Sequence, residues 1–144
     1  MDTSETYIKM CEKAVEIQAE MNINRIGDFF FSISFAEGKA FSNSYDSDMG
    51  ITTAEFVKIK TVGEQDKIVI WLPRQDQLQE MVGGLSDYLL YRFWDFLTDK
   101  KGEYALNSYS RQFKSFEQLW LAFVMMKKFN KNWSPEKEDW VNVS

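Results

Sequence analysis

The sequence contains no histidine and only one cysteine, Cys11. Without histidine, the chain can hold neither a Ser-His-Asp nor a Cys-His catalytic site, and no zinc site with imidazole ligands. A lone cysteine can neither close a disulfide within the chain nor build a thiolate cluster. A large fraction of hydrolase mechanisms is therefore excluded, and carboxylates, Lys, Tyr and Ser remain as reactive side chains.

Proline and glycine are also scarce, with 2 prolines and 7 glycines in 144 residues. No Pro/Gly linker therefore divides the chain, whose length is that of one ordinary domain. Hydrophobic residues make up 44% and aromatic residues 16% of the sequence, which is too apolar for a disordered segment. We expect a single globular domain over residues 1–144.

Basic residues are outnumbered, because 17 Lys and Arg stand against 22 Asp and Glu, which gives a formal net charge of −5. An acidic balance argues against a nucleic-acid partner, since phosphate contacts supply most non-specific affinity. The first residues lack the basic and apolar regions of a signal peptide, and no run approaches the ~18 apolar residues of a membrane span. We expect a cytoplasmic protein without membrane contact.

The first half of the chain predicts one helix followed by strands. Residues 3–21 have helical spacing, with Asp2 or Thr3 as the cap. The predicted apolar face of this helix consists of Tyr7, Ile8, Cys11, Ala14, Val15 and Gln18. Residues 28–35 alternate with the period of a half-buried strand, and residues 36–51 predict a long surface loop. Further strands at about 54–61 and 67–72, with a turn at 63–66, favour an antiparallel meander.

The second half predicts helices over 74–82, 86–98 and 115–129. Gly83-Gly84 ends the first, Ser86 caps the second, and Ser115 with Gln118 has the capping-box spacing for the third. The apolar stripe expected for the second helix consists of Leu89, Leu90, Phe93, Trp94 and Leu97. Residues 99–111 form a polar turn region, and 133–141 a tail with a helix start at Ser134-Pro135 and Trp140 as anchor. The predicted fold is α+β, with a small antiparallel sheet of about three strands packed by about four helices.

The helix that follows Pro73 is the first candidate site, because it brings a dense set of polar side chains next to a buried strand. Asp76 and Glu80 are four residues apart and project from one helical face, which suits either a divalent-metal pair or a polar recognition surface. The structural alternative is that Asp76 interacts favourably with the helix dipole and the glutamines solvate an ordinary outer face, because such charge patterning is common on helices. The candidate interaction surface consists of Arg74, Gln75, Asp76, Gln79 and Glu80.

A second candidate lies in the polar segment before the last helix, which contains Tyr104, Tyr109, Arg111 and Lys114. Tyr and Arg are enriched among the residues that dominate protein interfaces. The alternative is a plain connecting loop. With the first surface, this segment predicts a protein partner or self-association.

Two other chemistries are open. A metal-dependent phosphate-cleaving enzyme would need four carboxylates to converge, namely Asp46, Asp48, Asp76 and Glu80. Residues 46–57 do not fit a calcium-binding EF-hand loop, so an Asx-turn explains the two loop aspartates better. A single-stranded nucleic-acid module would stack bases on the aromatic run Phe29–Phe31, with Lys58 and Lys60 supplying charge. The alternative for that run is core packing.

Three stretches carry a resemblance to known proteins, namely Tyr7–Ala14 (YIKMCEKA), Trp71–Met81 (WLPRQDQLQEM) and Glu117–Met125 (EQLWLAFVM). Together they resemble a group of small uncharacterised proteins of bacteriophages and prophages. The segment from Gly83 to Ser110 departs from that group. The group carries no established activity, so the resemblance implies a phage or prophage setting and transfers no catalytic residue. Together with the missing catalytic chemistry, it predicts a non-enzymatic accessory protein that binds another protein or itself and needs no cofactor.

Overall fold

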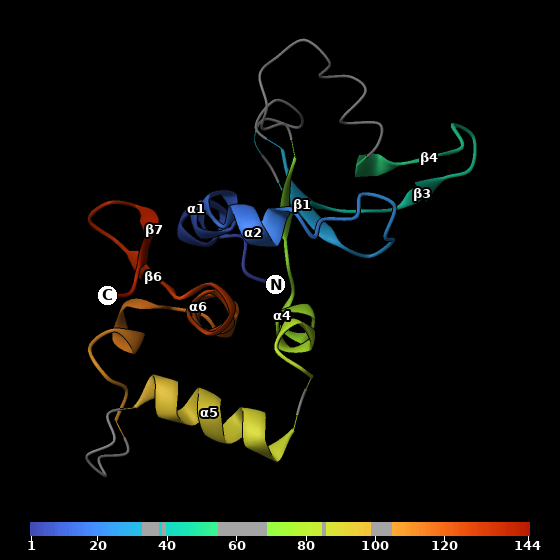
Figure 1. The fold of residues 1–144 in the computed structure, drawn as a ribbon. Helices are drawn as coiled ribbons and strands as arrows, with labels where there is room; N and C mark the ends of the chain where they lie inside the picture. The colour runs from blue at the N-terminus through green and yellow to red at the C-terminus, as the bar shows by residue number, and fades with distance from the viewer. Residues whose placement is uncertain (33–37, 39, 55–68, 85, 99–104) are drawn as a thin grey trace. The chain divides into compact units, whose positions relative to one another are not determined.

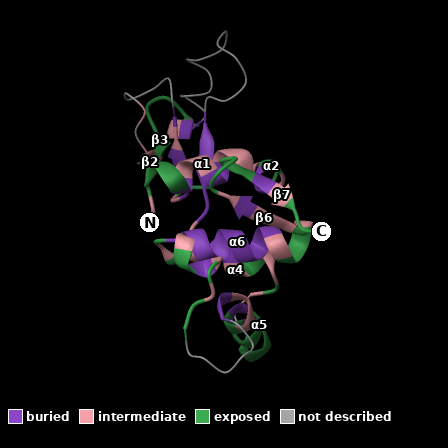
Figure 2. Ribbon diagram, turned by 90° about the vertical axis from the view of Figure 1, so that its left-hand side faces the viewer, coloured by how far each residue is buried: buried purple, intermediate pink, exposed green. Residues whose placement is uncertain are grey.

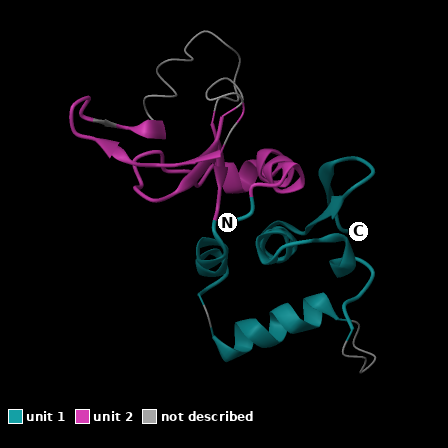
Figure 3. Cartoon of the chain, turned by 180° about the vertical axis from the view of Figure 1, so that it is seen from behind, with its two compact units in different colours: residues 1–2, 74–144 teal, residues 3–73 magenta. Residues whose placement is uncertain are grey.

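The computed structural model describes residues 1–32, 38, 40–54, 69–84, 86–98 and 105–144 (Figure 1). The fold is α+β, as predicted. The described residues form five α-helices, a three-stranded antiparallel sheet and two two-stranded hairpins. Two compact units can be distinguished, residues 3–73 (unit 2) and residues 1–2 with 74–144 (unit 1) (Figure 3). Their boundary falls inside the WLPRQDQLQEM stretch, between Pro73 and Arg74, and the single-domain expectation stays a prediction.

Unit 2 is a small sheet with helices from the start of the chain. Its described elements are α1 (Glu5–Lys13), α2 (Val15–Gln18), β1 (Phe29–Phe31), β2 (Ala40–Ser42), β3 (Tyr45–Asp46), β4 (Ile51–Thr52) and β5 (Ile70–Leu72). The sheet has the order β2-β1-β5, and Phe30 pairs with Phe41 on one side and with Trp71 on the other. β3 and β4 pair as a separate hairpin.

The predicted first helix is interrupted at Ala14, whose ψ of 69° leaves the helical region. The cap is Ser4, whose hydroxyl accepts the N–H of Tyr7, so the expectation of Asp2 or Thr3 as cap was wrong. The break also turns Val15 to solvent, whereas Ile17 is buried. The side chains of the buried stripe are Tyr7, Met10, Cys11, Ala14 and Ile17.

Two side chains from these helices hold the backbone around β5. The Gln18 amide donates from Nε2 to the carbonyl of Trp71 and accepts the N–H of the same residue at Oε1, each over 2.9 Å. The buried Tyr7 hydroxyl donates to the carbonyl of Pro73 over 2.5 Å. Because neighbouring residues of an antiparallel strand direct their backbone groups to opposite sides, Gln18 satisfies the side of Trp71 that β1 leaves open.

The strand predictions were correct at β1 and β5, and the prediction of a loop over 36–51 was wrong. Part of the predicted loop 36–51 forms β2, β3 and β4. Buried Asn43 fixes this region, since its Nδ2 donates to the carbonyls of Ile23 and Arg25 and its Oδ1 accepts the N–H of Ala54. In the predicted strand 54–61, Ala54 is helical and residues 55–61 lie outside the described part, as do the turn 63–66 and residues 67–68.

Unit 1 contains the three long helices predicted for the second half. Its described elements are α4 (Gln75–Met81), α5 (Asp87–Leu97), the 3₁₀ turn η1 (Ser110–Gln112), α6 (Phe116–Phe129), β6 (Lys131–Ser134) and β7 (Asp139–Asn142). Ser86 and Ser115 cap α5 and α6 as predicted, each accepting a backbone N–H three residues on. α4 and α6 lie side by side, and α5 crosses them (Figures 1 and 2).

Aromatic rings join α5 to α6. The Phe93 ring stacks on Trp120 with centroids 3.9 Å apart and an interplanar angle of 12°, and the edge of Phe123 meets both rings. Phe96 extends the cluster to Tyr109 on the segment before α6. Most of α6 is buried, which confirms its prediction from an apolar pattern on nearly every side (Figure 2).

The chain after α6 forms a hairpin, so the helix start expected at Ser134-Pro135 was wrong. Asn130 ends α6 in the left-handed conformation, with φ 54° and ψ 43°, and the chain turns into β6. Trp133 and Trp140 are opposite each other on β6 and β7, with centroids 5.2 Å apart in an edge-on arrangement. The cross-strand aromatic pair stabilises the hairpin, and Trp140 is an anchor in this sense.

Candidate functional site

The predicted surface on α4 is partly used by the helix itself. Gln77 lies on α4 between the residues of the predicted surface, and it is buried. Its Oε1 accepts the backbone N–H of Arg74, and this hydrogen bond caps the start of the helix. The Arg74 guanidinium donates two hydrogen bonds of 3.1 Å to the carboxylate of Asp76. Gln79 is half-buried and Glu80 exposed. The predicted interaction surface thus lies along one short polar helix, and its role in binding stays a prediction. Its residues are Arg74, Gln75, Asp76, Gln79 and Glu80.

The charge on Asp76 is already compensated within this surface. The hydrogen bond from Arg74 lowers the pKa of Asp76 below its ordinary value, helped by the positive charge of the guanidinium and opposed by partial burial. A carboxylate held in this way stays ionised near neutral pH, so it is a poor proton donor and a weak base. The pair is exposed to solvent, so it contributes little to stability.

The second predicted segment is only partly described, because Tyr104 lies outside the described residues. Tyr109 is half-buried, its ring meets Phe96 and Phe113 edge-on, and its hydroxyl accepts the backbone N–H of Trp133 over 2.8 Å. Arg111 is exposed and donates from Nε to the carbonyl of Leu106 over 2.6 Å. The contacts of Tyr109 connect the pre-α6 segment to the C-terminal hairpin, which is a structural task.

Substituting Tyr109→Phe is expected to lower the free energy of unfolding by about 1–3 kcal/mol near neutral pH, because the N–H of buried Trp133 loses its acceptor. Burial raises the pKa of Tyr109 to about 12, whereas an unfolded tyrosine ionises near 10. In the wild type, stability should therefore fall as the pH rises from 10 to 12, by roughly 1–2 kcal/mol after allowance for partial exposure.

Urea unfolding curves across this alkaline range would measure both effects. The Tyr109→Phe variant should lose less stability between pH 10 and 12 than the wild type, since it has no hydroxyl to ionise. Tyr45→Phe is the matched control, because Tyr45 is exposed on β3 and its hydroxyl should matter little. If the free energy of unfolding fell equally between pH 10 and 12 in the wild type and in Tyr109→Phe, the alkaline loss of stability would not come from the Tyr109 hydroxyl.

The carboxylates proposed for metal binding belong to two different parts of the chain. Asp46 and Asp48 lie in the β3–β4 hairpin, where Oδ1 of Asp46 accepts the N–H groups of Asp48 and Met49 in an Asx-turn. Asp76 and Glu80 lie on α4 in unit 1. Within the described residues, no three His, Cys, Asp or Glu side chains form a group that could hold a metal ion.

The middle residue of the predicted stacking platform for bases, Phe30, is part of the core. Phe30 is fully buried and stacks on Phe41 with centroids 5.9 Å apart, so its ring presents no free face to a base. Phe29 and Phe31 are half-buried. Lys58 and Lys60 lie outside the described residues.

Among the described residues, the surface best suited to binding another molecule lies on α5, and it was not predicted. α5 exposes three aromatic side chains, Tyr88 (69% exposed), Tyr91 (63%) and Trp94 (49%), and next to them Leu90 (45%). We call these four residues the aromatic face of α5. The buried side of the helix consists of Leu89, Phe93 and Leu97. Leu90 and Trp94 were predicted to be buried, and this prediction was wrong.

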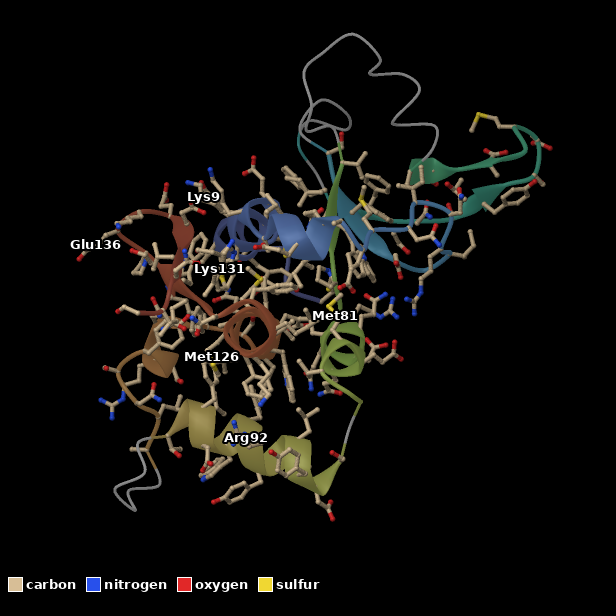
Figure 4. The ribbon with its side chains drawn as sticks, in the orientation of Figure 1. Lys9, Met81, Arg92, Met126, Lys131 and Glu136 are labelled. Atoms are coloured by element: carbon tan, nitrogen blue, oxygen red, sulfur yellow. The ribbon has the colours of Figure 1, made fainter. Side chains whose placement is uncertain are left out.

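Helix geometry makes the aromatic face continuous. Tyr88, Tyr91 and Trp94 follow one another at intervals of three and form one row along the helix. A second row, at intervals of four, consists of Asp87, Tyr91 and Asp95, so the two rows cross at Tyr91. Figure 4 shows the side chains of α5, where Arg92 is labelled. Asp87 is exposed and Asp95 half-buried, and neither lies on the side that packs on α6.

The sequence contained a signal for this face. Apolar residues surround most of α5, so hydrophobic spacing alone did not decide which side is buried. In the row Tyr88–Tyr91–Trp94 each side chain is itself amphipathic, since Tyr and Trp carry a polar group that tolerates water on an apolar ring. Such residues are preferred at surfaces that become buried on binding.

Comparisons with known proteins add no identity: no family model matches the chain, and neither a curated protein nor a solved structure matches it. Among the helices that the structure describes, none combines the length and apolar character needed to cross a bilayer.

Proposed function

We propose that this protein acts as a non-enzymatic accessory protein that binds another protein through the aromatic face of α5. The single observation that carries the proposal is the row of exposed aromatic rings at Tyr88, Tyr91 and Trp94. Tyr and Trp are the residue types most enriched among interface hot spots, and large exposed apolar patches mark interaction sites. The other four tryptophans are at most 6% exposed, so Trp94 is the exception that needs an explanation.

The setting that we propose is a bacteriophage or prophage, as the resemblance of the WLPRQDQLQEM and EQLWLAFVM stretches implies. Within these stretches, Trp71 and Trp120 are core residues, and Gln77 caps α4. The resembling residues therefore support a shared fold, while α5 lies in the segment that departs from that group. A helix that lies outside the resembling stretches and carries the contact residues suits proteins that share a scaffold and differ in partner.

Capture of partners from a bacterial lysate, followed by affinity measurement with the purified partner, would test this function. A double variant, Tyr91→Ala with Trp94→Ala, should weaken binding by at least about thirtyfold, since even one hot spot contributes roughly 2 kcal/mol or more and the two contributions need not add. Tyr45→Ala is the matched control, because it removes an aromatic ring of similar exposure from the β3–β4 hairpin.

A second comparison separates the two candidate surfaces. Gln75→Ala with Gln79→Ala changes the α4 surface and leaves its Arg74–Asp76 pair in place. If the partner is lost with this variant and kept with the α5 variant, α4 is the binding surface and the aromatic face is not. If no captured protein depends on Tyr91 and Trp94, the proposed function is contradicted.

A further inference from the structure

We infer that the partner of the aromatic face is a different protein, which presents a basic amphipathic segment rather than a second copy of this chain. The inference rests on the proposed function and deepens it, because it names the chemistry of the partner. It follows from the acidic residues that lie within the aromatic face and from the symmetry that self-association would impose.

The carboxylates of Asp87 and Asp95 border Tyr91 on both sides. Each is four residues from Tyr91, one toward the start of α5 and one toward its end, so the three side chains form one ridge. The two acids are separated by eight residues, about 12 Å along the helix axis. Arg92, the one basic residue of α5, lies outside this ridge. A ligand that covers Tyr91 therefore meets a negative charge at each end.

A second copy of the chain fits this pattern poorly. In a two-fold antiparallel pairing centred on Tyr91, Asp87 faces Asp95 of the second copy, and Asp95 faces its Asp87. In a parallel pairing, each aspartate faces its own equivalent. Both arrangements place like charges opposite each other twice, and such contacts disfavour an interface.

The size of the face supports the same conclusion. The eleven residues of α5 extend about 16 Å. The surface area that one face of such a short helix can bury is smaller than the roughly 800 Å² that each partner buries in a standard stable interface. A helix or strand laid across α5 needs less area, because a few anchors supply most of the affinity. The complementary segment has apolar side chains over Tyr88, Tyr91 and Trp94, and Lys or Arg about 12 Å apart at its two ends.

Two synthetic peptides provide the probe. Both are tryptophan-free amphipathic helices with the same leucine face, and they differ only at two positions eight residues apart, which are Lys in one peptide and Glu in the other. Protection of Trp94 from acrylamide quenching reports binding, because the remaining tryptophans of the chain are buried. The full chain should bind the Lys peptide at least about fivefold more tightly than the Glu peptide.

The protein variant that tests the ridge is Asp87→Asn with Asp95→Asn, verified as folded by circular dichroism. It should bind the Lys peptide about fivefold more weakly than the wild type, since two partly exposed charge pairs are lost. The matched control, Asp48→Asn with Glu136→Gln, removes the same net charge from two exposed sites outside α5 and should bind as the wild type does.

Several outcomes would overturn the inference. These are no binding of the Lys peptide, equal affinity for both peptides, an equal effect of the control variant, or a dimer in solution that Trp94→Ala dissociates. The outcome is separable from that of the proposed function. A cellular partner lost with Tyr91→Ala and Trp94→Ala, but bound unchanged by the Asp87→Asn and Asp95→Asn variant, would uphold the function and overturn the inference.

Discussion

Replacing Trp120 by alanine is expected to lower the free energy of unfolding by about 3–5 kcal/mol, the range for removing a large aromatic side chain from a packed core. Trp120 is 2% exposed and stacks on Phe93 with centroids 3.9 Å apart. The substitution therefore leaves a cavity where α5 packs on α6. Guanidinium unfolding followed by circular dichroism would measure the loss.

Phe116→Ala is the matched control on the same helix. Phe116 is 61% exposed, so its removal should change stability by no more than about 0.5 kcal/mol. If both substitutions had the same small effect on stability, the claim that Trp120 stabilises the packing of α5 on α6 would be contradicted. A second consequence is local: the Trp120→Ala variant should show faster hydrogen exchange in α5, because Phe93 loses its stacking partner.

The second large effect is expected at Phe30, where substitution by alanine should also cost about 3–5 kcal/mol. Phe30 is fully buried, and its strand neighbours Phe41 and Trp71 lie on either side. Its substitution removes the centre of the three-stranded sheet. The same variant discriminates between the core and the base-stacking interpretation of the aromatic run.

A stacking platform would respond in the opposite way. Phe30→Ala would then leave stability unchanged and weaken the binding of single-stranded DNA by roughly 1–3 kcal/mol. Ile26→Ala serves as the control, because Ile26 is exposed in the same unit. Melting of the free protein and titration with a short oligonucleotide would separate the two interpretations.

Together, the two substitutions also test the number of domains. If the chain is one cooperative domain, Trp120→Ala and Phe30→Ala should shift a single common transition. If residues 3–73 and 74–144 unfold independently, each variant should shift one transition and leave the other in place. Residue-resolved hydrogen exchange would assign the transitions to the units.

The features that the sequence predicted well are those with a local cause. Ser86 and Ser115 cap helices because their hydroxyls accept N–H groups three residues on, an interaction within one turn. Pro73 lies between the buried strand β5 and α4, where the predicted strand 67–72 and helix 74–82 place it. The buried α6 followed from an apolar pattern that left few sides for water.

The features that it did not predict depend on distant contacts. No residue near Ala14 signals that the helix breaks there. The break is compatible with the hydrogen bond between Gln18 and Trp71, which lies 53 residues further along the chain. β2 is only three residues long, so its pattern is too short to recognise. On α5, the orientation of Trp94 depends on which side packs on α6, and an all-round apolar composition cannot show this.

The amide of Gln18 has a consequence for assembly. A sheet whose last strand exposes backbone donors and acceptors can recruit a strand from another molecule, and this is a common route to fibres. At β5, the outward N–H and C=O of Trp71 are occupied by one helix-borne side chain, which cannot itself be extended by a further strand. Gln18 thereby occupies the position at Trp71 where a further strand would pair, so among the described residues α2 closes the β5 edge of the three-stranded sheet as well as covering its core.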